Sequence, residues 1–134
     1  TLKVYVDYAS QPCRALPMFF RAAKIPHEVV MLKFMAGEHK SDKITQLNPF
    51  QIVIRNIFNS SCYINKLFVL VTFAEHDGMV LRESMAILRY VTKVFDVPDH
   101  WYPKDLMGEQ KVNEYLHWQH LATRINCSMY FQVS

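Results

Sequence analysis

The sequence predicts an α/β domain followed by the beginning of an all-helical domain, on three observations. An alternating apolar segment over residues 2–8 precedes a helical pattern and a second, β-branched segment. Farther along, a hairpin-type turn with short apolar flanks precedes another helical pattern. The rest of the chain shows helical periodicity alone. A strand–helix–strand unit followed by a hairpin and a helix is the arrangement of thioredoxin-like domains.

The first three elements follow from residues 1–32. Apolar and polar side chains alternate over residues 2–8, which predicts a strand. Pro12 suits the first turn of a helix, because its missing N–H has no partner there. We expect this helix from about Pro12 to Lys24, bent at Pro17, and a second strand over His27–Leu32. The buried face of the helix is predicted to hold Leu16, Phe19, Phe20 and Ala23.

The remaining elements are read from the turn signals. A short helical turn is expected before Asn48–Pro49. The Asp-Gly pair at 77–78 predicts a hairpin between strands at Leu70–Ala74 and Met79–Leu81, because both residues readily take positive φ. From Glu83 apolar residues recur every three or four positions, which predicts a helix. Residues 97–103 contain two prolines and are expected to be a linker, followed by one long helix over Lys104–Phe131. We therefore expect a first domain over residues 1–97 and a second over 98–134.

Composition excludes several classes of function. A hydrophobic share of 51% and a charged share of 20% in 134 residues argue against disorder, and a net charge of +3 is too small to indicate nucleic acid. The three glycines are isolated, so no phosphate-binding loop is present. No apolar run reaches the ~18 residues of a membrane span. The three cysteines form no zinc motif or disulfide framework, which indicates a reducing, cytoplasmic compartment, and no signal peptide or metal site is expected.

Two helix starts carry candidate chemistry. Ser10 lies where a strand leads into a helix, and the partial positive charge of a helix N-terminus stabilises a thiolate. Taken alone, the spacing favours an ordinary N-cap for Ser10 and a buried packing role for Cys13 over a redox role. The Ser10 hydroxyl could donate a hydrogen bond to a bound sulfur anion, and the hydroxyls of Tyr5 and Tyr8 are alternatives for the same role.

The second helix start combines Glu83 with Ser84. Backbone N–H groups and a serine hydroxyl at a helix start can clamp a carboxylate, and a neighbouring acid can pair with an ammonium group. An N-cap with an acidic first turn is the simpler interpretation. Farther on, Glu114 and His117 have the E-x-x-H spacing of metal-carboxylate bundles, but no partner carboxylates accompany them, so we expect a surface or interhelix feature.

Several motifs in order closely resemble the theta-class glutathione S-transferases. They are YVDYASQPCRAL, GEHKSD, VLRESMAILRYV after the Asp-Gly turn, and VPDHWYPKDL followed by VNEYLHWQH, covering residues 1–51 and about 71–130. The resemblance implies a thioredoxin-like domain that binds glutathione and a helical domain for the electrophile. It also implies an enzyme of detoxification that conjugates the glutathione thiolate to small electrophiles, with glutathione as co-substrate, no cofactor and a possible homodimer.

The resemblance also implies roles for single residues. Ser10 would hydrogen-bond the glutathione sulfur, and Glu83 and Ser84 would hold its γ-glutamyl end. The remaining implied positions are His39 and Lys40 for the glycine carboxylate, the backbone of Val71 for the cysteinyl unit, and Arg124 near the electrophile.

Two features depart from the family pattern. Residues 52–70 have no family counterpart, and Thr72 stands where the family has a cis-proline, so we expect a trans peptide bond there. The sequence ends at Ser134, within the expected second domain. Two alternatives stay open: an inactive truncated or splice-variant chain that at most binds glutathione or a partner, and a redox protein that exchanges disulfides through Cys13.

Overall fold

The computed structural model describes residues 1–8, 10–33, 36–38, 41–49 and 72–123. These residues fall into two compact units. The first comprises the described residues up to Asp96, and the second those from Val97 onward. The expectation that residues 98–134 begin an all-helical domain stays a prediction.

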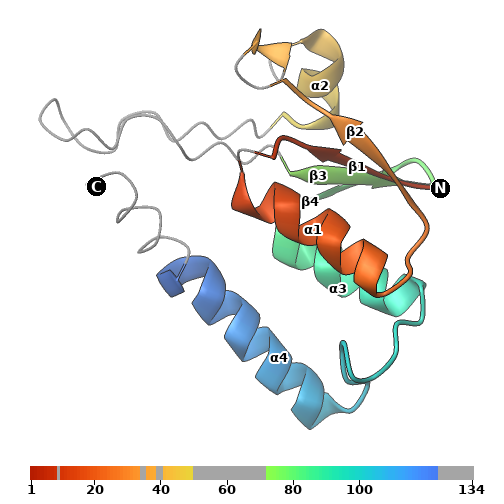
Figure 1. The fold of residues 1–134 in the computed structure, drawn as a ribbon, viewed down its shortest axis with the longest axis vertical. Helices are drawn as coiled ribbons and strands as arrows, with labels where there is room; N and C mark the ends of the chain where they lie inside the picture. Colours follow the sequence, from red (N-terminus) through yellow and green to blue (C-terminus); the bar gives the residue numbers. More distant parts are fainter. Residues whose placement is uncertain (9, 34–35, 39–40, 50–71, 124–134) are drawn as a thin grey trace, which may run out of the picture. The chain divides into compact units, whose positions relative to one another are not determined.

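The first unit is built on a four-stranded sheet with the order β2-β1-β3-β4 (Figure 1). The strands are β1 (Leu2–Val6), β2 (His27–Met31), β3 (Phe73–His76) and β4 (Met79–Arg82). β1 pairs with β2 in parallel, whereas β3 runs antiparallel to both of its neighbours. A parallel pair joined through a helix, next to an antiparallel hairpin, confirms the predicted thioredoxin-like arrangement.

In the described part of this unit, three α-helices accompany the sheet. α1 (Gln11–Ala22) and α3 (Ser84–Val94) contact each other and pack on the same side of the sheet (Figure 1). The short α2 (Asp42–Leu47) confirms the helical turn expected before residue 48. Arg82 Nη2 donates a hydrogen bond of 2.7 Å to the carbonyl oxygen of Leu47 and so ties the end of β4 to the end of α2.

The core lies between the sheet and the helices α1 and α3. Cys13, Leu16, Pro17 and Phe20 form the buried stripe of α1, at helical spacings of three and four residues. The prediction that Phe19 and Ala23 are buried was wrong, since both side chains are half-buried. They lie beside this stripe, and the positions in its centre belong to Cys13 and Pro17. The fully buried apolar side chains contributed by the sheet and α3 are those of Leu2, Val4, Val6, Phe73, Ala74, Ile87 and Val91.

The hairpin turn confirms the sequence prediction in detail. Asp77 has a φ of 49° and Gly78 a φ of 82°, which is the pair of positive values that a two-residue type I′ turn requires. Because the turn uses only these two residues, β3 continues to His76. Residues 70 and 71 of the predicted strand lie outside the described residues. The first strand, predicted to reach Tyr8, ends at Val6, because the chain turns between Asp7 and Ser10, where Ser10 N–H donates to the Asp7 carbonyl at 2.9 Å.

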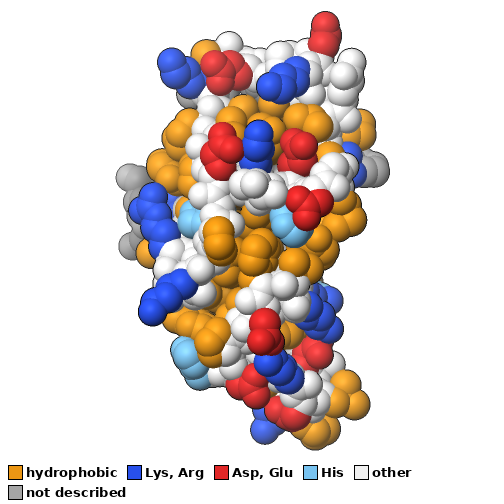
Figure 2. All heavy atoms as spheres, turned by 90° about the vertical axis from the view of Figure 1, so that its right-hand side faces the viewer, with side chains coloured by type: hydrophobic (Ala, Val, Ile, Leu, Met, Phe, Trp, Pro, Cys, Tyr) orange, Lys and Arg blue, Asp and Glu red, His pale blue; other side chains and the backbone are white. Residues whose placement is uncertain are grey.

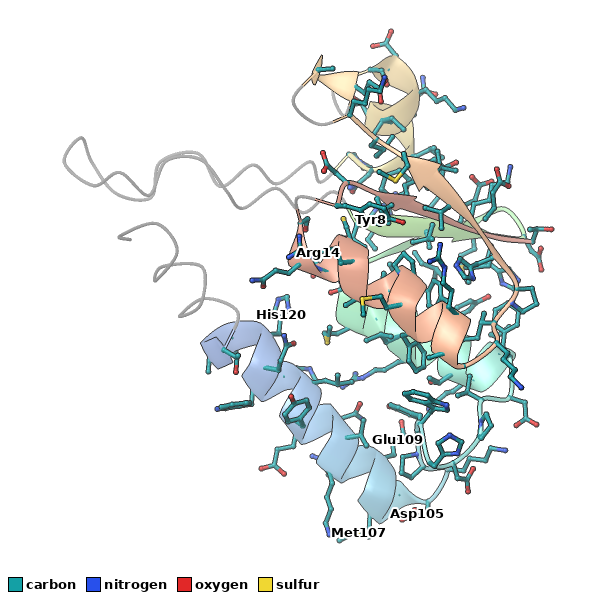
Figure 3. All side chains as sticks on the ribbon, in the orientation of Figure 1. Tyr8, Arg14, Asp105, Met107, Glu109 and His120 are labelled. Carbon is teal, nitrogen blue, oxygen red and sulfur yellow. The ribbon has the colours of Figure 1, made fainter. Side chains whose placement is uncertain are left out.

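The second unit contains the linker and the helix α4 (Leu106–Trp118). In the linker, the buried Tyr102 hydroxyl donates to Asn113 Oδ1 at 2.8 Å, and Asp105 caps the helix by accepting a 2.8 Å hydrogen bond from the N–H of Gly108. The structure differs from the single helix predicted over Lys104–Phe131. The α-helix ends at Trp118 and is followed by a π-helical turn over Gln119–Thr123. Residues 124–131 lie outside the described part. Several apolar side chains of this unit are exposed, among them Leu106, Met107, Tyr115 and Trp118 (Met107 is labelled in Figure 3).

Two general features of the described residues bear on function. None of their helices combines the length and apolar character needed to cross a membrane. Figure 2 shows acidic and basic side chains interspersed on the face that it displays, with hydrophobic side chains between them. That face carries no large area of charge of a single sign, as the small net charge predicts.

Candidate functional site

One end of the sheet collects the junctions that carry the candidate residues. In the strand register, Tyr5 of β1 lies opposite Val30 of β2 and opposite Phe73 of β3. Phe73 in turn lies opposite Arg82, the last residue of β4. The final residues of β1, β2 and β4 and the first residue of β3 therefore lie at the same end of the sheet.

Both long helices of the first unit begin at this end of the sheet. Ser10 follows β1 and precedes α1, while Glu83 follows β4 and precedes α3. Thr72 immediately precedes β3, between these two junctions in the sheet order. Each helix N-terminus carries about half a positive elementary charge, so this end of the sheet is suited to an anionic ligand.

Ser10 is the N-cap residue of α1 by backbone conformation, but its side chain does not cap the helix. Its φ of −88° and ψ of 132° are extended, and the hydroxyl makes no capping hydrogen bond. Pro12, in the first turn, has no N–H to offer. The side chain is half-buried. The simple capping role is therefore not realised, and the hydroxyl is not committed to the helix.

The two tyrosines proposed as rivals differ in what they contact. The buried Tyr5 stacks on Phe73, with ring centroids 4.4 Å apart, and its hydroxyl donates to Glu75 Oε2 at 3.3 Å. Burial, and then the Glu75 carboxylate, raise the pKa of Tyr5. The Tyr5 hydroxyl is thus committed to a carboxylate. Tyr8 is 42% exposed, and its backbone carbonyl accepts a hydrogen bond from Arg14 Nη1 at the start of α1 (Figure 3).

Cys13 has the packing role that the sequence favoured. Its side chain is fully buried, and its Sγ lies 2.9 Å from Oγ1 of Thr72, which is itself only 4% exposed. A thiol without solvent access cannot attack a disulfide, so the redox alternative has no support in this structure. Sequence analysis missed the pairing of Cys13 with Thr72, because 59 residues separate them and no local pattern links them.

The start of α3 combines backbone strain with an unsatisfied hydroxyl. Glu83 has a φ of 68° and a ψ of 115°, a conformation that costs a residue with a side chain about 1–3 kcal/mol. Its carboxylate is exposed and does not cap the helix. Ser84 is 2% exposed, and its buried Oγ has no hydrogen-bond partner. Strain and missing partners at one helix start are typical of a site whose partner is a ligand.

Several other predicted positions concern residues that the structure does not describe. His39, Lys40, Val71 and Arg124 lie outside the described residues, as does the segment 52–70. The expected trans bond before Thr72 involves residue 71 and is likewise outside. No group of three or more potential metal ligands occurs among the described residues. His117 of the E-x-x-H motif is exposed, and its Nδ1 lies 2.7 Å from the carbonyl oxygen of Asn113.

Comparison with known proteins identifies relatives over nearly the whole chain. Glutathione S-transferase theta-1 from Bos taurus is 39% identical over 126 residues, which are 94% of this chain and 45% of the relative. A mutant of human glutathione S-transferase T1-1 in its apo form matches with a TM-score of 0.72 and 36% identity, over 95% of this chain and 46% of its own. Human theta-2 in complex with glutathione and an unknown ligand matches with a TM-score of 0.69 and 32% identity, over 90% and 42%. No protein-family model matches the sequence.

The fold and these matches define the class of the protein: it has the thioredoxin-type fold of the glutathione S-transferases. Within that class, the chain is a homologue of the theta-class glutathione S-transferases, and the resemblance drawn from the sequence motifs is confirmed. The chain spans about half the length of the relatives that it matches.

Proposed function

We propose that this chain binds reduced glutathione at the sheet end where α1 and α3 begin, and that it acts as a glutathione transferase. The observation that carries the proposal is the start of α3. There, a buried Ser84 oxygen without a partner follows Glu83 in a strained conformation. A ligand carboxylate would supply the acceptor that the hydroxyl lacks, and the exposed Glu83 carboxylate would pair with an ammonium group. An α-amino acid end, such as the γ-glutamyl end of glutathione, offers both groups.

The start of α1 is suited to the sulfur of the same ligand. The Ser10 hydroxyl makes no capping bond, so it is available to donate a hydrogen bond to a thiolate. The N-terminal charge of α1 would favour the same anion. In the reaction, the thiol proton leaves to solvent, sulfur donates its electron pair to an electrophilic carbon, and the leaving group departs with the bonding pair.

The relatives support the rest of the proposal. The matching human theta-2 structure is described as a complex with glutathione. By the same homology, we propose that His39 and Lys40 hold the glycine carboxylate, that the Val71 backbone pairs with the cysteinyl unit and that Arg124 lies near the electrophile. We extend the proposal to detoxification of small electrophiles by a cytoplasmic homodimer that needs no cofactor and binds neither nucleic acid nor membrane.

Glutathione titration in a calorimeter tests binding, and an assay with a small haloalkane tests turnover. We expect Ser84→Ala to weaken binding roughly tenfold, because a hydrogen bond to a charged group is lost. Ser10→Ala should leave binding nearly unchanged and lower turnover, whereas Ser10→Thr, which keeps the hydroxyl, should retain much of it. Thr92→Val is a matched control, since Thr92 is buried but its hydroxyl already donates to the Arg89 carbonyl within α3.

Two outcomes would contradict the proposal in different ways. Absence of glutathione binding to the unaltered chain would overturn it entirely. Binding without turnover would leave only a glutathione-binding chain, which is the alternative that the sequence left open.

A further inference from the structure

The buried contact between Cys13 and Thr72 joins two parts of the proposed site. Cys13 is the third residue of α1, and Thr72 is the residue before β3. Their side chains are buried, and the Sγ–Oγ1 distance is 2.9 Å. The contact therefore connects the first turn of the helix that follows Ser10 to the entry of a central strand.

This connection reaches Ser10 through a single helical turn. Ser10 precedes Cys13 by three residues, and residues at this spacing are neighbours on a helix surface. The turn is closed by the Arg14 N–H, which donates to the Ser10 carbonyl at 3.3 Å. A movement of the first turn of α1 away from β3 would carry Ser10 with it.

A second hydrogen bond at this place is local and exposed. Arg14 Nη1 binds the Tyr8 carbonyl, six residues back in the chain (Figure 3). It stabilises the shape of the loop but does not tie the loop to another strand. The Cys13–Thr72 contact, by contrast, is buried and bridges 59 residues. Buried hydrogen bonds are stronger than exposed ones, because water does not compete with them.

We propose that Thr72 and Cys13 are positioning residues, whose mutual hydrogen bond sets the Ser10 hydroxyl for the sulfur of bound glutathione. This inference rests on the proposed function and adds two buried residues that act through Ser10. Catalytic groups must be held to within about half an ångström by the side chains behind them. A displacement of about 1 Å can cost a hundredfold in rate.

The test measures the thiolate of glutathione bound to the 134-residue chain, by its ultraviolet absorbance as a function of pH at saturating glutathione. Thr72→Val keeps the shape of the side chain but removes the hydroxyl. We expect it to lower the thiolate fraction roughly three- to tenfold at a pH within the transition, because a charge-assisted hydrogen bond is weakened. Thr72→Ser, which keeps the hydroxyl, should restore most of the fraction.

Two further variants separate positioning from stability. Cys13→Ala removes the same bond from its other side, so it should act in the same direction and keeps the proposal testable should Thr72→Val not fold. Thr92→Val removes a buried hydroxyl in the second half of α3, and we expect it to change the unfolding temperature but not the titration.

The decisive arm repeats Thr72→Val in a Ser10→Ala background. If Thr72 acts through Ser10, the second substitution adds no further loss of thiolate, so the two effects are not additive. An unchanged titration in Thr72→Val, or an equal loss with and without the Ser10 hydroxyl, would overturn the inference. If Ser10→Ala itself leaves the thiolate fraction unchanged, the proposed role of Ser10 fails as well. A loss in Ser10→Ala but not in Thr72→Val would refute the positioning pair alone.

Discussion

Ser84→Ala should raise the stability of the free protein while it weakens glutathione binding. The Ser84 side chain is 2% exposed, and its oxygen has no hydrogen-bond partner. A hydroxyl in this state has lost its hydrogen bonds to water without replacement. Alanine removes the hydroxyl, keeps the β-carbon and favours helix at this first position of α3.

The size of the gain follows from the burial of that oxygen. A buried polar group without a partner costs about 1–3 kcal/mol, and alanine avoids this cost. The helix preference of alanine over serine adds up to about 0.5 kcal/mol. We therefore expect the free energy of unfolding to rise by about 1–3 kcal/mol. For a domain of about 60–100 residues, such as the first unit, each kcal/mol raises the melting temperature by about 4–8 °C.

Urea unfolding without glutathione measures the gain, and calorimetric titration with glutathione measures the loss of affinity. Thr92→Val serves as the control, because the Thr92 hydroxyl is also buried but donates to Arg89 at 2.9 Å. Removal of the Thr92 hydroxyl should reduce stability, because a satisfied buried hydrogen bond is lost, and it should not alter glutathione affinity. If Ser84→Ala instead lowers stability by more than about 1 kcal/mol, the oxygen has a partner in solution, and the reasoning from its burial is wrong.

Three other substitutions test the strain, the core and the electrostatics. Glu83→Gly should raise the free energy of unfolding by about 1 kcal/mol, since glycine tolerates the positive φ of 68°. It should also weaken glutathione binding, because the carboxylate is lost. A lower free energy of unfolding in urea would contradict the assigned strain. Phe20→Ala should lower the free energy of unfolding by about 3–5 kcal/mol, because the ring is fully buried between α1 and the sheet; a loss below about 1 kcal/mol would show that the site is not packed as described. Tyr5→Phe should flatten the alkaline fall in stability: the folded pKa of Tyr5 is raised, so its contribution is complete below about pH 10 and is lost as the pH rises through the folded pKa. Urea unfolding measured from neutral to alkaline pH tests the Tyr5→Phe prediction. An unchanged slope of the unfolding free energy against pH would contradict it.

The order of the elements could be predicted because local signals are strong in this chain. The Asp-Gly pair at 77–78 demands positive φ at two successive residues, which fixes both the turn and the pairing of β3 with β4. Helical spacing placed Leu16 and Phe20 on the buried face of α1. The same spacing could not decide which flanking positions are buried. That depends on where the helix lies on the sheet, and Cys13 and Pro17 proved to be central instead of Phe19 and Ala23.

The site could be predicted in its residues but not in its physical state. Sequence identified Ser10, Glu83 and Ser84 through their places at helix starts and through family motifs. Nothing in the sequence indicates that Glu83 takes a positive φ, because glutamate has no preference for it. Nor does the sequence show that the Ser84 oxygen is buried without a partner, or that Thr72 contacts Cys13. These properties arise only when β3, β4 and both helices come together.

Two free-energy costs of the unliganded chain lie together at one end of the sheet, and this location links stability to ligand binding. Strain at Glu83 and the unsatisfied Ser84 hydroxyl both destabilise the free chain at the start of α3. A ligand carboxylate that accepts from Ser84 removes part of this cost only in the bound state. Glutathione should therefore stabilise the folded chain by RT ln(1 + [L]/Kd), about 2.7 kcal/mol at one hundred times Kd. At the same glutathione concentration, Ser84→Ala should gain less, because the free variant has already lost the unsatisfied hydroxyl and its affinity is lower.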